Sequence, residues 1–272
     1  MYERPHWDRP MLKSYARTSL KNYYWKAVLA TLIVTILSGG YMASSGIKAE
    51  QEVTSNVLQN SLFSVNDAQV TLRDFIFPRS AADAAVYGIV GVILAIIVLS
   101  AIALGSLYSI FVVNPLTVGH HRFYLDNRFA PTDIGRIFRG FTGNYGNVTK
   151  TMFLRSLYIF CWGLLLIIPG IIKSYEYAMV PYILAENPNM PTARVFQLSK
   201  EMMRGRKWDL FVLHLSFIGW RMLASLVLVG NIFLNPYINA TNAEVYLWLR
   251  YDALHLGYAQ SHELDGMFGS AT

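Results

Sequence analysis

Long apolar runs separated by short basic segments make up the hydropathy pattern of this chain. From residue 84 to residue 119 no side chain is charged, and the breaker Asn114-Pro115 closes the most apolar part. A helix needs about 20 mainly apolar residues to cross the hydrocarbon core of a bilayer, which is roughly 30 Å thick. The pattern therefore predicts a spanning helix at residues 87–113, long enough to tilt or to project beyond the membrane.

A second span is predicted near the N-terminus, at residues 25–41. Trp25 and Tyr41 stand at its ends, where aromatic side chains anchor a helix in the membrane interface. The competing interpretation is a cleaved signal peptide, because small residues follow the run at positions 43–45. The long basic segment before the run and the further spans after it favour a helix that is retained.

A third apolar segment is long enough for two crossings. Residues 152–184 are interrupted by Lys173 and Glu176, with Pro169-Gly170 in the middle. We expect this segment to cross the membrane twice, with its turn near Pro169-Gly170. If it only dips into the bilayer, the number of spans falls and the orientation of the following chain changes.

Two further helices are predicted toward the C-terminus. Residues 208–230 form an apolar run interrupted by His214 and Arg221. The next segment, residues 237–256, carries charges at Glu244, Arg250 and Asp252. Hydropathy alone does not predict a span there, and the C-terminus lies in the cytoplasm only if this segment crosses.

Lys and Arg residues are concentrated in three segments, at residues 1–24, 114–150 and 187–207. Since cytoplasmic loops carry an excess of Lys and Arg, we expect all three segments to face the cytoplasm. Residues 42–85 carry more acidic than basic side chains and are predicted to form an outer loop. The three basic segments reach one side only if residues 152–184 cross twice.

These predictions define an all-α fold, a polytopic helical membrane bundle of about six spans. The chain is predicted to form a single integral membrane domain, residues 1–272, with both termini in the cytoplasm. Interfacial amphipathic helices are expected at the N-terminus and in a cytoplasmic segment.

Two of the basic segments have the periodicity of amphipathic helices. Residues 11–24 place basic side chains four apart on one face and an aromatic-aliphatic stripe on another. This pattern is typical of a helix on an anionic leaflet, and a plain orientation signal is the alternative. Residues 191–205 are similar, and we favour an interfacial connector over a partner-docking surface. The predicted contacts with anionic lipid head groups are Lys13, Arg17, Lys21, Arg204, Arg206 and Lys207.

Polar residues inside the predicted spans should be paired, since an unpaired charge in hydrocarbon costs at least about 2.5–3.5 kcal/mol. Lys207, His214 and Arg221 stand seven residues apart and share one helix face. Glu176, with Lys173 one turn before it, is the expected acidic partner. The predicted intramembrane polar cluster comprises Lys173, Glu176, His214 and Arg221, with Arg155 and Glu244 as further members. We favour a role in locking helix packing over a pathway or a head-group site.

Composition agrees with a hydrocarbon environment. The 272 residues are 54% hydrophobic and 15% charged, whereas an ordinary soluble domain has roughly 25% charged residues. These values exclude a disordered chain and disfavour a water-soluble enzyme. The net charge of +6 is explained by membrane orientation, so no nucleic-acid partner is expected. The single cysteine, Cys161, excludes an intrachain disulfide framework and a cysteine-based metal cluster.

No sequence motif for catalysis is present. GxSxG, P-loop, HExxH and GxGxxG patterns are absent. Adjacent side chains on a helix point about 100° apart, so His120-His121 is a poor metal site. We therefore expect no catalytic residue, no metal site and no cofactor.

Several motifs resemble a known family of bacterial integral membrane proteins. They are LKNYYWKAV at residues 20–28, LLLIIPGIIKSYEYAMVPYILAENP at 164–188, MMRGRKWDLF at 202–211, LSFIGW at 215–220 and NPY at 235–237. The family is the domain of unknown function nine-seven-five, common in Gram-positive Firmicutes, and the resemblance covers nearly the whole chain. It implies an all-helical protein of the bacterial plasma membrane with a genuine element at residues 237–256. It supplies no activity.

We therefore expect a multi-spanning protein of the bacterial plasma (inner) membrane that is not an enzyme. The role that fits these features best is a non-catalytic accessory or assembly component of the cell envelope. Its expected partners are the lipid bilayer, anionic lipid head groups and another membrane protein. The alternative is a small permease or lipid-handling transporter that uses the intramembrane Glu/His/Arg cluster.

Overall fold

The computed structural model describes residues 7–39, 80–130, 132–226 and 230–264. Every regular element in these ranges is helical and none is a strand, which confirms the predicted all-α fold. The chain divides into two compact units, one formed by Met1–Ser38 with Ile110–Thr272 and the other by Gly39–Ser109. Most of the predicted outer loop, residues 42–85, lies outside the described residues.

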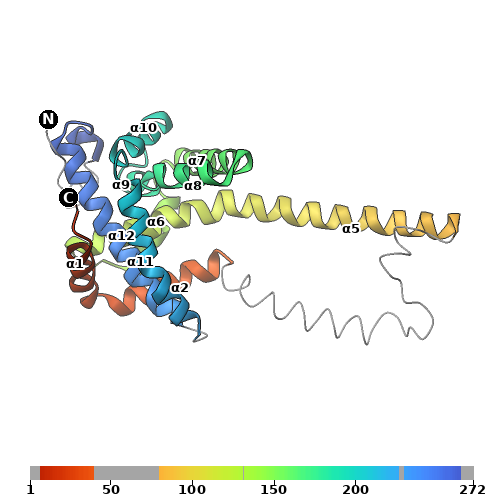
Figure 1. Ribbon diagram of the computed structural model, residues 1–272, viewed down its shortest axis with the longest axis horizontal. Helices are drawn as coiled ribbons and strands as arrows, with labels where there is room; N and C mark the ends of the chain where they lie inside the picture. The colour runs from red at the N-terminus through yellow and green to blue at the C-terminus, as the bar shows by residue number, and fades with distance from the viewer. Residues whose placement is uncertain (1–6, 40–79, 131, 227–229, 265–272) are drawn as a thin grey trace. The chain divides into compact units, whose positions relative to one another are not determined.

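The labels of Figure 1 follow the order of the elements along the chain. The larger unit contains α1 (Arg9–Lys21), α2 (Tyr24–Leu37), α6 (Asn114–Phe129), the 3-10 helix η2 (Ile134–Phe141), α7 (Tyr145–Leu165), α8 (Ile167–Glu176), α9 (Val180–Glu186), α10 (Thr192–Met202), α11 (Lys207–Ser225), α12 (Gly230–His255) and the 3-10 helix η3 (Ser261–Leu264). The smaller unit contributes α5 (Ala81–Tyr108), and the π-helical turn η1 (Ser109–Val113) follows it in the chain.

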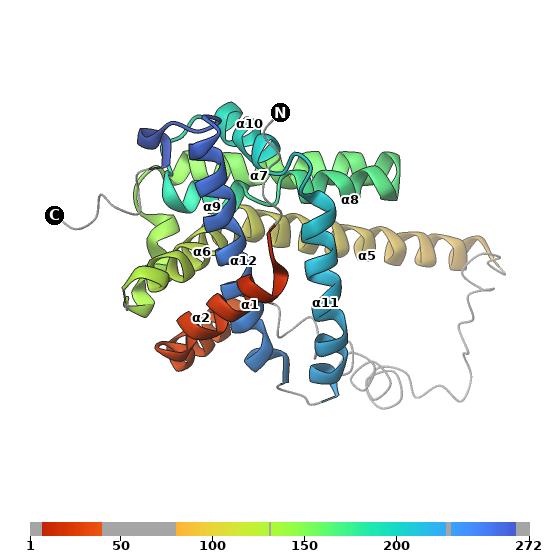
Figure 2. The same cartoon turned by 60° about the vertical axis from the view of Figure 1, so that its left-hand side comes forward.

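The central helix of the larger unit is α12. Helices α1, α2, α6, α10 and α11 all pack against it, and Figure 2 shows α1 and α11 beside it. Its buried residues include Val245, Tyr246 and Leu249 together with the charged Glu244 and Asp252. The charges that disfavoured a span at residues 237–256 therefore lie inside a protein core, where polar partners can satisfy them.

Helix α6 and η2 are in backbone contact. A Cβ on Gly119 would overlap the carbonyl oxygen of Ile137, and a Cβ on Gly140 would overlap that of Pro115. Since any side chain at either glycine would force the two elements apart, the pair of glycines sets their separation. Asp133 begins η2 by accepting a hydrogen bond from the Gly135 amide.

Helices α7 and α8 form an antiparallel hairpin that turns at Leu166, which has extended backbone angles (φ −158°, ψ 141°). A Cβ on Gly170 would lie 2.7 Å from the Cα of Gly163, so the arms are in close contact. The segment therefore turns back near the predicted place, but at Leu166, three residues before Pro169. Pro169 is the third residue of α8, and a proline is tolerated in the first turn because the amide it lacks would have no helical acceptor.

The return arm of this hairpin is short. Helix α8 has 10 residues and is therefore about 15 Å long, roughly half of the hydrocarbon core. Helix α9 follows, and all seven of its residues are buried in the protein. A second crossing by the residues up to 184 is not formed by any helix of membrane length in the described chain.

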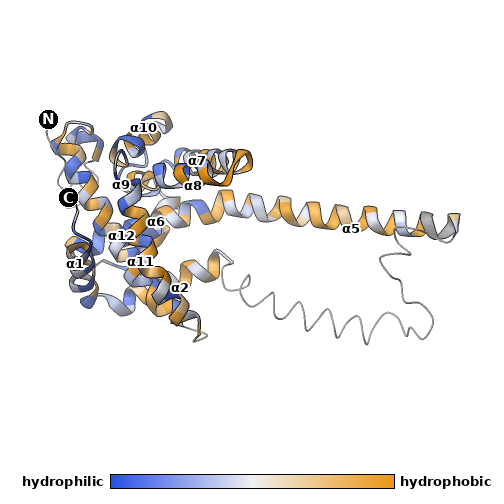
Figure 3. Cartoon of the chain, in the orientation of Figure 1, coloured by the Kyte–Doolittle hydropathy of each residue, from blue (hydrophilic) through white to orange (hydrophobic). Residues whose placement is uncertain are grey.

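Large apolar side chains are exposed at the end of the hairpin. Residues 164–168, all Leu or Ile, are 67–77% exposed. Figure 3 shows hydrophobic residues along α5 and at the end of α7 and α8. In the described part of the chain one helical stretch, Ala85–Phe129, has the length and hydropathy needed to cross a membrane, and α2 is apolar but has only 14 residues. Six spans are therefore not confirmed.

Candidate functional site

The predicted pairing of Glu176 is present at the base of the hairpin. Its carboxylate lies 2.8 Å from the ammonium of Lys173 and 2.6 Å from that of Lys207. Lys200, which sequence reasoning missed, lies 3.9 Å away on α10. Helices α8, α10 and α11 thus bring three ammonium groups around one carboxylate. This hairpin-base cluster, Lys173, Glu176, Lys200 and Lys207, carries an excess of positive charge.

Aromatic and apolar surface adjoins the hairpin-base cluster. A cavity of about 440 Å³ beside it is also lined by Arg204 and Trp208, and the Trp208 side chain is 71% exposed. The Lys173 ammonium lies 5.4 Å from the ring centroid of Trp162, and Ile172, the residue before Lys173, is exposed. Tryptophan next to basic side chains is the composition found where protein meets the membrane interface.

His214 and Arg221 do not join this cluster. The imidazole of His214 lies 3.4 Å from the Tyr175 hydroxyl and 3.1 Å from the side-chain oxygen of Asn242. Arg221 is exposed and forms no ion pair with any described residue. The reason is distance, since Arg221 stands 14 residues after Lys207 and so about 21 Å further along α11. A carboxylate that pairs with Lys207 therefore cannot also pair with Arg221.

Arg155 and Glu244 have partners outside the hairpin-base cluster. Arg155 donates to the backbone oxygen of Tyr177 at 2.8 Å, which holds the turn between α8 and α9. The Glu244 carboxylate pairs with Arg128 at 2.6 Å and joins α12 to α6. Both interactions tie helices together, as expected for the packing role.

Among the predicted lipid contacts, Arg206 is in the core. It is 4% exposed, lies 4.9 Å from the ring centroid of Trp248 and pairs with Asp209. It is the N-cap residue of α11 and packs against Trp248 of α12. Arg206 is therefore not available to a lipid head group, whereas Arg204 is exposed.

The basic face of α1 also meets protein. Lys13 donates to the Ser216 hydroxyl at 2.7 Å and lies 4.5 Å from the ring centroid of Phe217. Arg17 lies 6.0 Å from the ring centroid of Tyr237, while Lys21 is exposed. The face of α1 that carries Lys13 and Arg17 therefore borders α11 and α12, with a cavity of about 880 Å³ between them.

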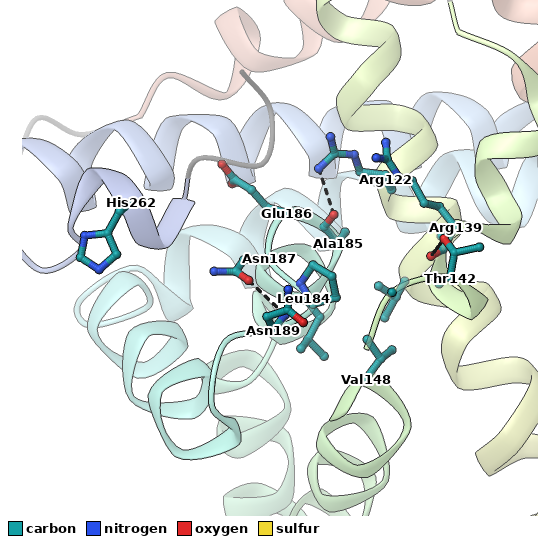
Figure 4. Close-up of a pocket in the computed structure, with 15 residues that line it drawn as sticks. Arg122, Arg139, Thr142, Val148, Leu184, Ala185, Glu186, Asn187, Asn189 and His262 are labelled. Carbon is teal, nitrogen blue, oxygen red and sulfur yellow. Dashed lines mark hydrogen bonds between the residues drawn. The ribbon is translucent and has the colours of Figure 1, made fainter. Parts of the chain in front are cut away.

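A second polar cavity, which we call the arginine cavity, was missed by sequence reasoning. It has a volume of about 530 Å³, and Figure 4 shows the side chains that line it. Its polar lining residues include Arg122, Arg139, Thr142, Glu186, Asn187, Asn189 and His262. The one sequence feature that could have pointed to this cavity is the Glu186-Asn187-Pro188 turn. It lies inside the longest family motif, but its sequence is typical of an ordinary loop.

Buried ion pairs hold one wall of the arginine cavity. The Glu186 carboxylate accepts hydrogen bonds from the Tyr246 hydroxyl at 2.6 Å and from Arg250 at 2.8 Å. Burial raises the pKa of Glu186, and the Tyr246 hydrogen bond and the Arg250 charge act in the opposite direction. This wall joins α9 to α12.

Arginines of α6 and η2 form the opposite wall. Arg122 is 4% exposed, pairs with Asp126 at 2.7 Å and donates to the backbone oxygen of Ala185 at 3.0 Å. Arg136 lies 3.2 Å from the same Asp126 carboxylate. Arg139 forms no hydrogen bond or ion pair through its side chain with any residue that the structure describes. No group of three or more His, Cys, Asp or Glu side chains in the described ranges is placed to hold a metal ion.

Fold and site together define an all-helical protein with exposed apolar helices next to a lysine-rich cluster. The chain belongs to the family described as Protein of unknown function (DUF975), whose model matches residues 7–252. This match confirms the resemblance in the sequence motifs. No curated protein and no solved structure matches the chain.

Proposed function

We propose that this chain is a membrane-embedded protein of the bacterial plasma membrane with a non-catalytic accessory or assembly role in the cell envelope. In this proposal the hairpin-base cluster binds anionic lipid head groups. The observation that carries the proposal is the exposure of large apolar side chains on α5 and at the end of the α7–α8 hairpin. Exposure of such a surface to water is unfavourable, whereas its contact with lipid hydrocarbon is favourable.

The hairpin end supports the proposal by its energetics. Five consecutive Leu and Ile side chains are each about two-thirds exposed or more. Full burial of one such side chain is worth roughly 1.5–3 kcal/mol, so moving this group from water into hydrocarbon is favourable by several kcal/mol. Soluble monomers rarely expose contiguous apolar patches of more than a few hundred Å².

The length of the hairpin determines how deeply it enters the bilayer in this proposal. With a return arm of about 15 Å, the hairpin enters one leaflet and leaves on the side from which it came. Lys173 and Glu176 then lie at its base, at the level of the head groups. Trp208, which lines the cavity beside Glu176, suits the same depth.

Helix α5 is the proposed full crossing. Its unit begins after Ser38 and ends before Ile110, and both ends join the larger unit. A single crossing by α5 therefore requires another crossing before it, for which α2 and the predicted span at residues 25–41 are the candidate. The basic residues that follow α5 support a cytoplasmic position for the segments after it, and two crossings in all would leave both termini on that side.

Charge supports the choice of ligand. The hairpin-base cluster has three ammonium groups and one carboxylate, and the cavity beside it adds one charge of each sign, Arg204 and Glu201, so the net charge stays positive. Each Lys or Arg near an anionic membrane surface adds about 1 kcal/mol of attraction. Phosphatidylglycerol is a suitable probe because its head group is a phosphodiester anion.

Cys161 provides the test of embedding, because it is the single cysteine and lies exposed on α7 within the hairpin. We expect a maleimide to leave Cys161 unmodified in nanodiscs and to modify it fully after denaturation in dodecyl sulfate. A Gly146→Cys variant in a Cys161→Ser background, at the base of the hairpin, should react in both conditions. Rapid modification of Cys161 in nanodiscs would place the hairpin in water and contradict the proposal.

Lipid binding is tested by single charge removals of equal size. Lys200→Gln should weaken binding of the protein to phosphatidylglycerol in mixed bilayers by about fivefold, as native mass spectrometry of nanodiscs can measure. Arg139→Gln removes the same charge from the arginine cavity and should leave phosphatidylglycerol binding unchanged. Equal effects of the two variants would mean that net charge alone attracts the lipid, and the hairpin-base site would be excluded.

A separate experiment tests the accessory role. Native nanodiscs drawn from the source membrane should contain a second membrane protein at fixed stoichiometry with this chain. Recovery of the chain alone with one stoichiometric lipid would contradict the accessory role and favour the lipid-handling alternative.

A further inference from the structure

The arginine cavity contains more cationic than anionic groups. Six charged side chains line it or support its walls: Arg122, Arg136, Arg139, Arg250, Asp126 and Glu186. Asp126 is shared by Arg122 and Arg136, and Glu186 is paired with Arg250. These six side chains carry a net charge of +2, and Arg139 is the one that forms no ion pair with a described residue.

The guanidinium group of Arg139 carries the positive charge that is available to a ligand. It lines the cavity, and its side chain has no hydrogen bond or ion pair with the described residues. Figure 4 shows that it reaches toward Arg122 from the η2 side. Burial, followed by the positive charges of Arg122 and Arg136, lowers the pKa of Arg139. Like charges held this close are stabilised when an anion lies between them.

Other groups of the cavity can also donate hydrogen bonds. The Asn189 side chain has no hydrogen bond to another described residue, and the His262 imidazole lies on the same lining. Arg122 is held in place by Asp126 and by the backbone oxygen of Ala185. A fixed guanidinium beside a free one is suited to an oxyanion, because the planar fork of each can donate two hydrogen bonds.

We infer that the arginine cavity binds the phosphate group of a small phosphorylated molecule. A phosphomonoester carries a charge of about −1.5 to −2 at neutral pH, which matches the two surplus positive charges, whereas a single carboxylate supplies half of that. The cavity of about 530 Å³ is of the size that takes a whole small molecule. The organic part of the ligand therefore has room beside the phosphate.

This inference does not depend on the lipid proposal. The arginine cavity is lined by α6, η2, α9, the loops after them, the start of α7 and η3, whereas the hairpin-base cluster belongs to α8, α10 and α11. The phosphate group has two possible sources, a soluble phosphomonoester and the phosphomonoester head group of phosphatidic acid. The experiment separates them.

The test uses the full chain in phosphatidylcholine nanodiscs, titrated with inorganic phosphate and with glycerol 3-phosphate by isothermal calorimetry. We expect saturable binding that Arg139→Gln weakens by about tenfold or more, since a hydrogen bond to a charged group is lost. Arg204→Gln removes the same charge from the other cavity and should change the affinity by less than about twofold. Circular dichroism of both variants checks that the fold is retained.

A second set of nanodiscs contains phosphatidic acid. If phosphatidic acid prevents binding of glycerol 3-phosphate to the wild type, and Arg139→Gln relieves this competition, the lipid phosphate is the source. If glycerol 3-phosphate binds equally with and without the lipid, the ligand is soluble. The inference is overturned if neither phosphate compound binds the wild type, or if Arg139→Gln binds them as well as the wild type does.

Discussion

Gly119 and Gly140 are the residues at which the smallest chemical change should have the largest effect. Each sits where the backbone of α6 meets that of η2, and a Cβ at either would overlap a carbonyl oxygen. A backbone oxygen cannot rotate away as the end of a flexible side chain can. The two elements would therefore have to separate, and they also form one wall of the arginine cavity.

We accordingly expect Gly119→Ala to lower the free energy of unfolding by about 2–3 kcal/mol, the upper part of the range for overpacked sites. Gly219→Ala is the matched control, because Gly219 lies inside α11 with open space around its Cα. That variant should be neutral or more stable by up to about 1 kcal/mol, since alanine favours helix. Thermal unfolding in nanodiscs measures both, and equal melting temperatures would contradict the backbone contact.

A bidentate pair makes the attachment of η3 depend on pH. Arg194 donates to both carboxylate oxygens of Glu263, at 2.7 and 2.9 Å. These hydrogen bonds lower the pKa of Glu263 from 4.5 to about 2. The pair therefore contributes its full stability above pH 4.5, and that contribution is lost as the pH falls toward 2.

Arg194→Gln should consequently melt at a lower temperature than the wild type at pH 7, and the difference should become smaller as the pH falls to 2, where the lost hydrogen bond to the Tyr258 backbone oxygen still counts. Thermal unfolding followed from pH 7 to pH 2 gives this comparison, and carboxyl NMR should find a higher pKa for Glu263 in the variant than in the wild type. Lys150→Gln, an exposed position on α7, should follow the wild type throughout. A difference between Arg194→Gln and wild type that is independent of pH would rule out the ion pair as its cause.

At the scale of elements, the α7–α8 hairpin depends on the apolar character of its end. Ile168→Asp should prevent insertion, since a carboxylate at that depth costs about 2.5–3.5 kcal/mol in hydrocarbon. The expected result is that Cys161, protected from maleimide in wild-type nanodiscs, becomes reactive. Gly146→Asp places the same side chain in the first turn of α7, where an acidic group is favourable, and should leave Cys161 protected.

The long helices could be predicted from the sequence because their hydropathy patterns extend over many residues. The predicted span at residues 87–113 falls on α5 and η1, and the amphipathic segments fall on α1 and α10. The turn at Leu166 was missed because Leu166 looks like its apolar neighbours, whereas Pro169 looks like a breaker and is accommodated within the first turn of α8. Local sequence cannot separate these two cases, since the close contact of Gly163 with Gly170 decides between them.

The sites were predictable only where their residues are close in sequence or on one face. Helical spacing predicted that Lys173 pairs with Glu176 and that Lys207 lies on an inward helix face. The structure brings these three residues together. Lys200 was missed because its position depends on how α10 packs. The arginine cavity combines segments more than 60 residues apart, such as Arg122 with Ala185, so no local pattern contains it.

At the scale of the whole molecule, residues 39–109 are an insertion into the larger unit. The buried hydrophobic core of the described residues comes entirely from residues 7–30 and 116–264. In detergent micelles, where the linker need not cross a bilayer, replacing residues 42–107 with a flexible Gly/Ser linker of about 20 residues, whose ends lie roughly 25 Å apart on average, should therefore leave the larger unit folded. We expect a cooperative unfolding transition and unchanged affinity for glycerol 3-phosphate. Loss of cooperative unfolding would show that the core needs the insertion.

The short return arm of α8 has a mechanical consequence for the surrounding bilayer. A hairpin that penetrates one leaflet adds cross-sectional area to that leaflet and none to the other. In the proposed embedding, the inner leaflet around each copy expands and the bilayer bulges toward the cytoplasm. Crowding of this protein should thus generate local curvature.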